Sequence, residues 1–212
     1  MKLTKEIRKI MLAYALGDGH IRLQGKYCSL RVAHSTKQSD YLEWKLSKIR
    51  SFCTSGSVLF ENSGYAGIKF TSKSYKFLRL YNKTLYKDKE KVITPKHLKS
   101  VGDIGLAILY MDDGSLYVKK TTKGVPHAYE MVISLYFKKE QQVMDIIHFI
   151  KQTYGVIFTV KRNKGRFSIR CGTKEARKFI EIVKPFVSQV PSLRYKIEMS
   201  ENLKVQALFN KQ

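Results

Sequence analysis

The chain has 212 residues, of which 43% are hydrophobic, a share typical of a folded globular protein and too high for a disordered one. Forty Lys and Arg against 17 Asp and Glu give a net charge of +23. Because so large an excess repels itself, it indicates a polyanionic partner, and nucleic acid fits best. Apolar runs fall short of the roughly 18 residues that span a bilayer. The N-terminus also lacks a secretory hydrophobic region, so we expect no membrane partner.

Cysteine usage adds a prediction about the compartment. Cys28, Cys53 and Cys171 are odd in number and widely spaced, and they form no zinc-ligand pattern. Reduced thiols are therefore expected, in an intracellular, reducing environment. An organelle, a phage-infected cell and a cytoplasm all satisfy this expectation.

The first half of the chain alternates between helical and strand-like periodicity. Thr4 is an expected N-cap for a helix that runs to Leu16. The following elements are strands over His20–Gln24 and Tyr27–His34, a helix over Ser39–Phe52, strands over Ser57–Glu61 and Gly67–Thr71, and a helix over Ser74–Tyr81.

The second half repeats this order. Its elements are a helix over Ser100–Met111, strands over Ser115–Lys120 and Tyr129–Phe137, a helix over Lys139–Tyr154, strands over Val156–Arg162 and Arg166–Cys171, and a helix over Lys174–Val187. The repeat is αβαββα, with the first β a pair of strands, and it predicts an α+β protein with two pseudo-symmetric halves. We place the halves at 1–95 and 96–212, with the join in the polar stretch 87–99.

Each half opens with an apolar helix that ends in Asp-Gly, at Met11–Gly19 and Leu106–Gly114. A carboxylate at a helix C-terminus is disfavoured by about 0.3–1 kcal/mol, so its repetition calls for a reason. Small residues on both helices permit close packing, which brings Asp18 and Asp113 together for a cation. Oxygen ligands favour Mg²⁺, and metals held by carboxylates assist phosphodiester hydrolysis. Asp-Gly on its own is a common turn, so the prediction depends on the doubling.

Alternation along the strands separates an apolar face from a polar one. The polar face is rich in Arg, Lys, Gln, Ser and Thr and poor in acidic residues, which suits base edges and phosphates of the DNA major groove. The residues expected to contact DNA are Arg22, Gln24, Ser29, Arg31, Lys69, Thr71, Tyr117, Lys119, Thr159, Lys161, Asn163, Arg166, Ser168 and Arg170.

The two Asp-Gly segments resemble the LAGLIDADG motif, and the chain resembles the single-chain, two-motif LAGLIDADG homing endonucleases over nearly its full length. The resemblance implies a saddle of two four-stranded antiparallel sheets on DNA, with the motif helices paired at the interface. It also implies that Asp18 and Asp113 bind the metal, assisted by the backbone carbonyls of Gly17 and Asp112. The sixth motif position, often Asp, is Leu16 in one copy and Met111 in the other.

The family also supplies one basic residue late in each half, near the scissile phosphate and its water. In the second half the pattern Arg194-Tyr195-Lys196-Ile197 matches, which makes Lys196 the candidate. In the first half the match falls on Lys91, with Lys89 as the alternative.

The resemblance therefore implies a monomeric, site-specific homing endonuclease that cleaves both strands of a long double-stranded DNA target. The expected cofactor is Mg²⁺, with Mn²⁺ or Ca²⁺ able to substitute in binding. The alternative is an intron RNA maturase on the same fold, with intron RNA as its partner. A DNA-binding regulator without activity is a further reading, although it predicts a lost motif Asp, and both are present.

Overall fold

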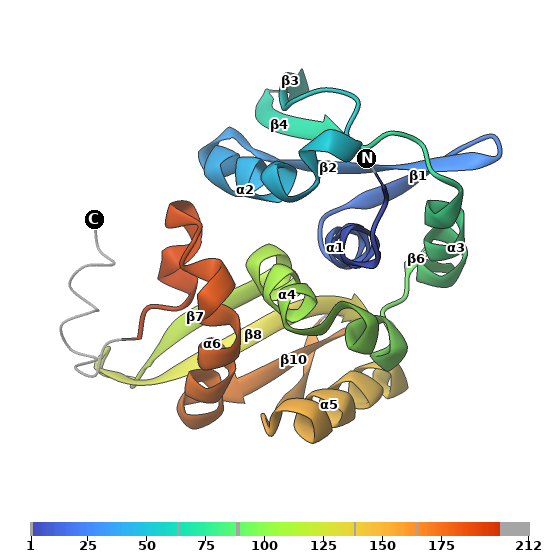
Figure 1. Cartoon of the computed structure of the whole chain (residues 1–212). Coiled ribbons are helices and arrows are strands. Elements are labelled where there is room, and N and C mark those ends of the chain that lie inside the picture. The colour runs from blue at the N-terminus through green and yellow to red at the C-terminus, as the bar shows by residue number, and fades with distance from the viewer. Residues whose placement is uncertain (1, 63, 88–89, 138, 164, 200–212) are drawn as a thin grey trace.

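Two four-stranded antiparallel sheets, each with helices packed on one face, make up the chain (Figure 1). This computed structural model describes residues 2–62, 64–87, 90–137, 139–163 and 165–199. Each half runs αββαββα when every strand is counted. The predicted class, α+β with two pseudo-symmetric halves, is confirmed.

The first half forms a sheet in the order β1-β2-β4-β3. Its elements are α1 (Lys5–Leu16), β1 (His20–Gln24), β2 (Tyr27–Ser35), α2 (Ser39–Ile49), β3 (Val58–Asn62), β4 (Tyr65–Thr71) and α3 (Lys76–Leu85). Thr4 caps α1 as expected, since its hydroxyl accepts a hydrogen bond from the amide of Ile7 at 3.2 Å.

The second half repeats the topology in the order β7-β8-β10-β9. Its elements are α4 (Pro95–Asp113), β7 (Gly114–Lys120), β8 (Pro126–Phe137), α5 (Glu140–Tyr154), β9 (Thr159–Asn163), β10 (Arg166–Gly172) and α6 (Thr173–Val187), followed by a 3₁₀ turn over Pro191–Lys196.

Some boundaries differ from the prediction. Helix α4 begins at Pro95 instead of Ser100, because Thr94 and His97 form a capping box and Pro95 takes the first helical position. The helix is interrupted at Gly102, where φ is 58°, so its motif portion starts after this break. The predicted join also contains a small hairpin, β5 (Tyr86–Lys87) with β6 (Glu90–Lys91), that periodicity cannot detect in so few residues.

Helices α1 and α4 pack side by side between the two sheets (Figure 1). Ala13, Ala15 and Ala107 are fully buried, as close approach of the two helices requires. The glycine after each motif aspartate is also needed, because a Cβ on Gly19 or Gly114 would lie 2.4 Å from a backbone carbonyl oxygen of its own motif helix. The two Asp-Gly ends are therefore fixed beside each other at the centre of the molecule.

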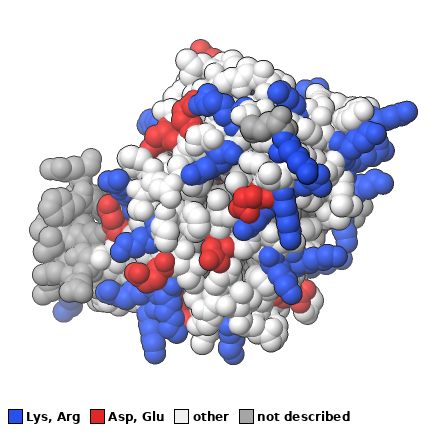
Figure 2. All heavy atoms as spheres, viewed as in Figure 1, with Lys and Arg blue, Asp and Glu red and all other residues white. Residues whose placement is uncertain are grey.

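Lys and Arg side chains are scattered over both halves of the face seen in Figure 2, with Asp and Glu side chains among them. None of the described helices combines the length and apolar character that a membrane span needs.

Candidate active site

Asp18 and Asp113 line one cleft of about 690 Å³. Asp18 follows the end of α1, and Asp113 is the last residue of α4. The same cleft is lined by Gly17, Lys91 and residues of the second half that include Leu135. The structure thus brings together the two carboxylates that the sequence singled out.

The two carboxyl groups are held in an environment that disfavours their charge. Burial raises the pKa of Asp113 to about 7, together with the negative charges of the neighbouring Asp112 and Asp18. Burial and Asp112 raise the pKa of Asp18 to about 6, although its side chain is 44% exposed. The Asp113 carboxylate makes no hydrogen bond or ion pair within the part of the chain that the structure describes. Two such carboxyls form a site that a cation would stabilise.

The two candidate lysines lie next to this pair. Lys91, in β6, donates hydrogen bonds from Nζ to the carbonyls of Gly17 and Gly19. Lys196 is 4% exposed and donates from Nζ to the carbonyl of Met111 at 2.5 Å. Burial lowers the pKa of both amines. The alternative candidate, Lys89, lies outside the described residues.

The side chain of Asp112 is fully buried and already paired. Its Oδ1 accepts from Lys45 Nζ at 2.7 Å and from the Tyr41 hydroxyl at 2.8 Å. Its Oδ2 accepts from the backbone amide of Asp18 at 2.8 Å. Burial acts to raise the pKa of Asp112, but Lys45, His34 and these hydrogen bonds outweigh it, and the pKa is lowered. Asp112 is therefore an ionised structural link between the two halves.

Lys45 and His34 were not singled out from the sequence. Lys45 is 0% exposed and His34 is 5% exposed, and Lys45 Nζ lies 3.1 Å from His34 Nε2. A signal for both existed: Lys45 interrupts the apolar stripe of α2, and His34 continues the buried alternation of Leu30 and Val32. A polar residue in a core position requires a buried partner.

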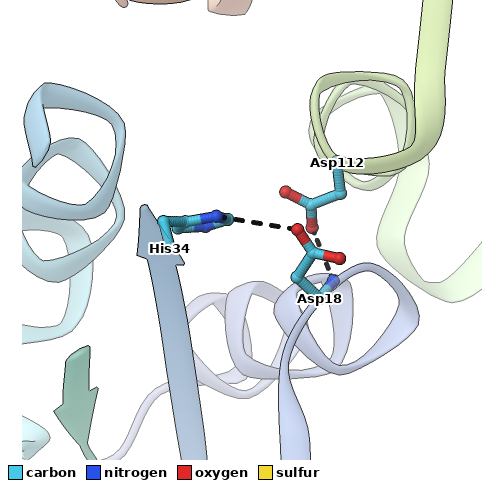
Figure 3. A group of neighbouring side chains, drawn as sticks. All are labelled: Asp18, His34 and Asp112. Atoms are coloured by element: carbon cyan, nitrogen blue, oxygen red, sulfur yellow. Dashed lines mark hydrogen bonds and ion pairs between the residues drawn. The ribbon is translucent and has the colours of Figure 1, made fainter. Parts of the chain in front are cut away.

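Asp18, His34 and Asp112 offer ligand atoms that lie within 4.8 Å of one another, as a metal cluster would (Figure 3). His34 Nδ1 faces Asp18 Oδ2 at 3.6 Å. Burial, followed by the charge of Lys45, lowers the pKa of His34 to about 4, so the ring is neutral at neutral pH. Because the Lys45 ammonium already contacts both oxygens of Asp112, a cation is present at this cluster without a metal.

The strand register places the predicted DNA-contact residues of the first half on one face. His20 pairs with Arg31, and Arg22 pairs with Ser29, opposite the buried Ile21 and Leu30. The other residues of this face follow from the pairing of β1, β2 and β4: Gln24, Lys69 and Thr71. Ser29 is only 2% exposed, so its hydroxyl lies below the surface that a duplex would meet.

The second sheet has the same arrangement. Its register puts Tyr117, Lys119, Thr159, Lys161, Arg166, Ser168 and Arg170 on the face away from the buried Met131 and Ile169. The backbone of Asn163 follows this register, but its side chain lies outside the described residues. Glu130 contacts Lys119 at 3.7 Å and Arg170 at 3.4 Å, and Ser168 is 8% exposed.

Two motif helices with paired terminal aspartates, between two basic antiparallel sheets, define a LAGLIDADG-type nuclease fold. The sequence model of the LAGLIDADG DNA endonuclease family matches residues 8–179. The chain belongs to this family, which confirms the resemblance seen in the two Asp-Gly segments.

Individual relatives are more distant. A solved structure of the homing endonuclease I-WcaI bound to its DNA recognition sequence superposes with a TM-score of 0.79 at 21% identity, covering 94% of this chain and 89% of that chain. The probable intron-encoded endonuclease 1 of Wickerhamomyces canadensis is 23% identical and covers 92% of this chain and 85% of its own length. Protein RecA of Mycolicibacterium flavescens is 25% identical over 92% of this chain. The chain spans about half the length of that relative, 47%.

Breaking the buried Lys45–Asp112 ion pair should destabilise the folded protein. Lys45→Met leaves the Asp112 carboxylate buried without its cation, and we expect the free energy of unfolding in urea to fall by about 3–5 kcal/mol. Adding Asp112→Asn removes the unpaired charge, so the double variant should lose less than the sum of the single variants. Lys48→Met, on the exposed side of α2, should stay within about 0.5 kcal/mol of wild type. Equal stability of the Lys45 and Lys48 variants would contradict the role of the pair.

The raised pKa of Asp113 predicts a pH-dependent stability. A carboxyl with a higher pKa in the folded state binds its proton more tightly there, so its contribution is full below about pH 4 and lost as the pH rises through about 7. Without divalent cations, the free energy of unfolding of Asp113→Asn minus that of wild type should therefore increase between pH 4 and 7. Above about pH 7 this difference should stay constant. Asp145→Asn, on the exposed side of α5, reports the effect of a surface change. A pH-independent difference for Asp113→Asn would show that this carboxyl is not perturbed.

Proposed function

We propose that this chain is a site-specific endonuclease that cuts both strands of a long double-stranded DNA target by metal-dependent phosphodiester hydrolysis. The observation that carries the proposal is the meeting of Asp18 and Asp113, from equivalent ends of two packed motif helices, in one cleft. Membership of the LAGLIDADG DNA endonuclease family supports it. Because one chain supplies both aspartates, a monomer suffices for the reaction.

The residues present fit a divalent cation. Asp18 and Asp113 offer hard carboxylate oxygens, and their raised pKa values reflect burial first and then repulsion from neighbouring aspartates, both of which a cation would offset. Oxygen donors in an open, hydrated cleft suit Mg²⁺, and also Mn²⁺ or Ca²⁺ in binding. When bound, such an ion would supply a polarised water and charge stabilisation for the phosphate.

Lys91 and Lys196 each add one basic group beside the aspartates of the proposed active site. Each amine is held by carbonyls at the end of a motif helix, so its position next to the aspartates is fixed before DNA arrives. An ammonium in this place stabilises negative charge that develops on the phosphate oxygens. Its lowered pKa also eases proton exchange with a water in the cleft.

The polar sheet faces are proposed to contact the duplex. Arg22 and Arg31 lie on the polar face of the first sheet, and Lys161 and Arg170 lie on that of the second. Lysine and arginine position phosphates, and the Gln, Ser and Thr side chains between them suit base edges. The I-WcaI structure, solved on its recognition sequence, supports this use of the fold.

The catalytic assignment predicts a separation of cleavage from binding. We expect Asp18→Asn or Asp113→Asn to reduce single-turnover cleavage in Mg²⁺ by at least a thousandfold, because each removes a charged ligand. Affinity for the same duplex in Ca²⁺ should change by less than about threefold. The substrate is the duplex recovered from a randomised library by cleavage with wild-type protein. Asp145→Asn serves as the matched surface control, and full cleavage by the two motif variants would refute the site.

The binding assignment predicts a steep salt dependence. The logarithm of the association constant should fall linearly with the logarithm of salt concentration, by about 0.9 for each phosphate contact. Arg22→Ala and Arg31→Ala, measured by fluorescence anisotropy, should each weaken binding, and a lost phosphate contact should flatten the slope by about 0.9. Lys151→Ala, on the exposed side of α5, should leave both quantities unchanged. Unaltered affinity and slope in both arginine variants would exclude the polar face of the first sheet as a DNA-binding surface.

A further inference from the structure

The two halves can be aligned residue by residue. His20 and Ser115 each lie two residues after a motif aspartate, and they pair with Arg31 and Val132, respectively. Counting three residues onward along β2 and β8 makes His34 the counterpart of Leu135.

The helices that follow align in the same way. The buried aliphatic residues Leu42, Leu46 and Ile49 of α2 align with the buried Val143, Ile147 and Ile150 of α5. In this alignment Lys45 corresponds to Ile146, and Tyr41 corresponds to Gln142. The motif itself pairs Asp112 with Gly17.

Around Asp18 these positions form a connected polar network. The Lys45 ammonium donates to Asp112 Oδ1 at 2.7 Å and Oδ2 at 3.0 Å, and lies 3.1 Å from His34 Nε2. Since an ammonium has only donors, Nε2 must accept, and the ring proton is on Nδ1. That proton faces Asp18 Oδ2, and Asp112 Oδ2 holds the Asp18 amide at 2.8 Å (Figure 3). Asp18 is therefore contacted at both its backbone and its carboxylate.

The corresponding positions around Asp113 hold no charge. Leu135 and Ile146 are buried and apolar, and Gly17 has no side chain. Gly17, Leu135 and Gln142 instead line the 690 Å³ cleft. The space that Asp112, His34 and Tyr41 fill beside Asp18 thus corresponds to open cleft beside Asp113.

We propose that Lys45, His34 and Asp112 are positioning residues that fix Asp18, with no equivalent for Asp113, so that the two strands are cut by unequally supported centres. This proposal rests on the nuclease function proposed above. The network orders Asp18 before DNA or metal binds, which preserves the geometry that an in-line attack requires. Asp113 depends on the bound substrate and cation for the same ordering.

The decisive variant replaces each residue of the network around Asp18 by its counterpart around Asp113. His34→Leu, Lys45→Ile and Asp112→Gly together remove all three polar groups and leave no buried charge unpaired. In single-turnover cleavage of the library-derived duplex, labelled separately on each strand, we expect the ratio of the two strand rate constants to shift at least tenfold. The dissociation constant for DNA in Ca²⁺ should stay within about threefold of wild type. An unchanged strand ratio would overturn the proposal.

Single variants keep the test informative if the triple variant folds poorly. His34→Leu leaves the Lys45–Asp112 pair intact and should shift the strand ratio, whereas His34→Asn retains an N–H near the Nδ1 position and should restore it in part. Ile146→Met, at the equivalent place in the second half, should leave the ratio as in wild type. A shift caused equally by Ile146→Met would indicate a general packing effect and refute the positioning role.

Hydrogen exchange separates this inference from the nuclease proposal. The Asp18 amide, followed by NMR, should exchange at least tenfold faster in the triple variant, while core amides of α1 keep their wild-type rates. If wild-type protein cuts neither strand of any library duplex, the proposed function fails, and this measurement still tests the network. Unchanged exchange at Asp18 would show that Asp112 does not hold it.

Discussion

Packing of α1 against α4 concentrates negative charge at one point, and the centre of the molecule is arranged to balance it. Both helices end there, each with the partial negative charge of a C-terminus, and three aspartates add their carboxylates. Three buried or half-buried lysines compensate: Lys45 from α2, Lys91 from β6 and Lys196 from the last 3₁₀ turn. None of them belongs to a motif helix, so the surrounding elements have to fold around the pair before the charges are balanced.

In the proposed function, the same arrangement separates chemistry from recognition. The motif helices occupy the axis between the halves, and each sheet uses one face to cover its own helices. The other face carries mainly basic and hydroxyl side chains, of which Ser29 and Ser168 are themselves buried. If this face contacts DNA as proposed, substitutions there would alter recognition, whereas the two aspartates are positioned by the packing of α1 against α4.

Much of this organisation could be predicted from the sequence, because local periodicity indicates it. The alternation of Leu30 and Val32 with Arg31 fixes which side of β2 is buried, and the register agrees. The motif helices and their terminal aspartates follow from the doubled pattern in the same way. The positions of Lys91 and Lys196 came from family resemblance, since nothing in the spacing of lone lysines distinguishes them from surface lysines.

What escaped prediction is non-local. The pairing of Lys45 with Asp112 joins residues 67 positions apart in opposite halves, so no local rule connects them. The start of α4 was missed because its first turns depend on the cap at Thr94 and end at the break at Gly102. Asp112 was treated only as a neighbour of Asp113, whereas its side chain accepts the hydrogen bond from the Asp18 amide that connects α4 to the end of α1.

Gly17 also determines whether the two halves are interchangeable. A Cβ at this position would lie 1.8 Å from Asp112 Oδ2, so the aspartate of one half requires a glycine in the other. A symmetric dimer of the second half would bring two aspartates to the same spot, and a dimer of the first half would bring two glycines and lose the bond. The halves are complementary partners of unlike shape, and joining them in a single polypeptide guarantees that each meets the other and never a copy of itself.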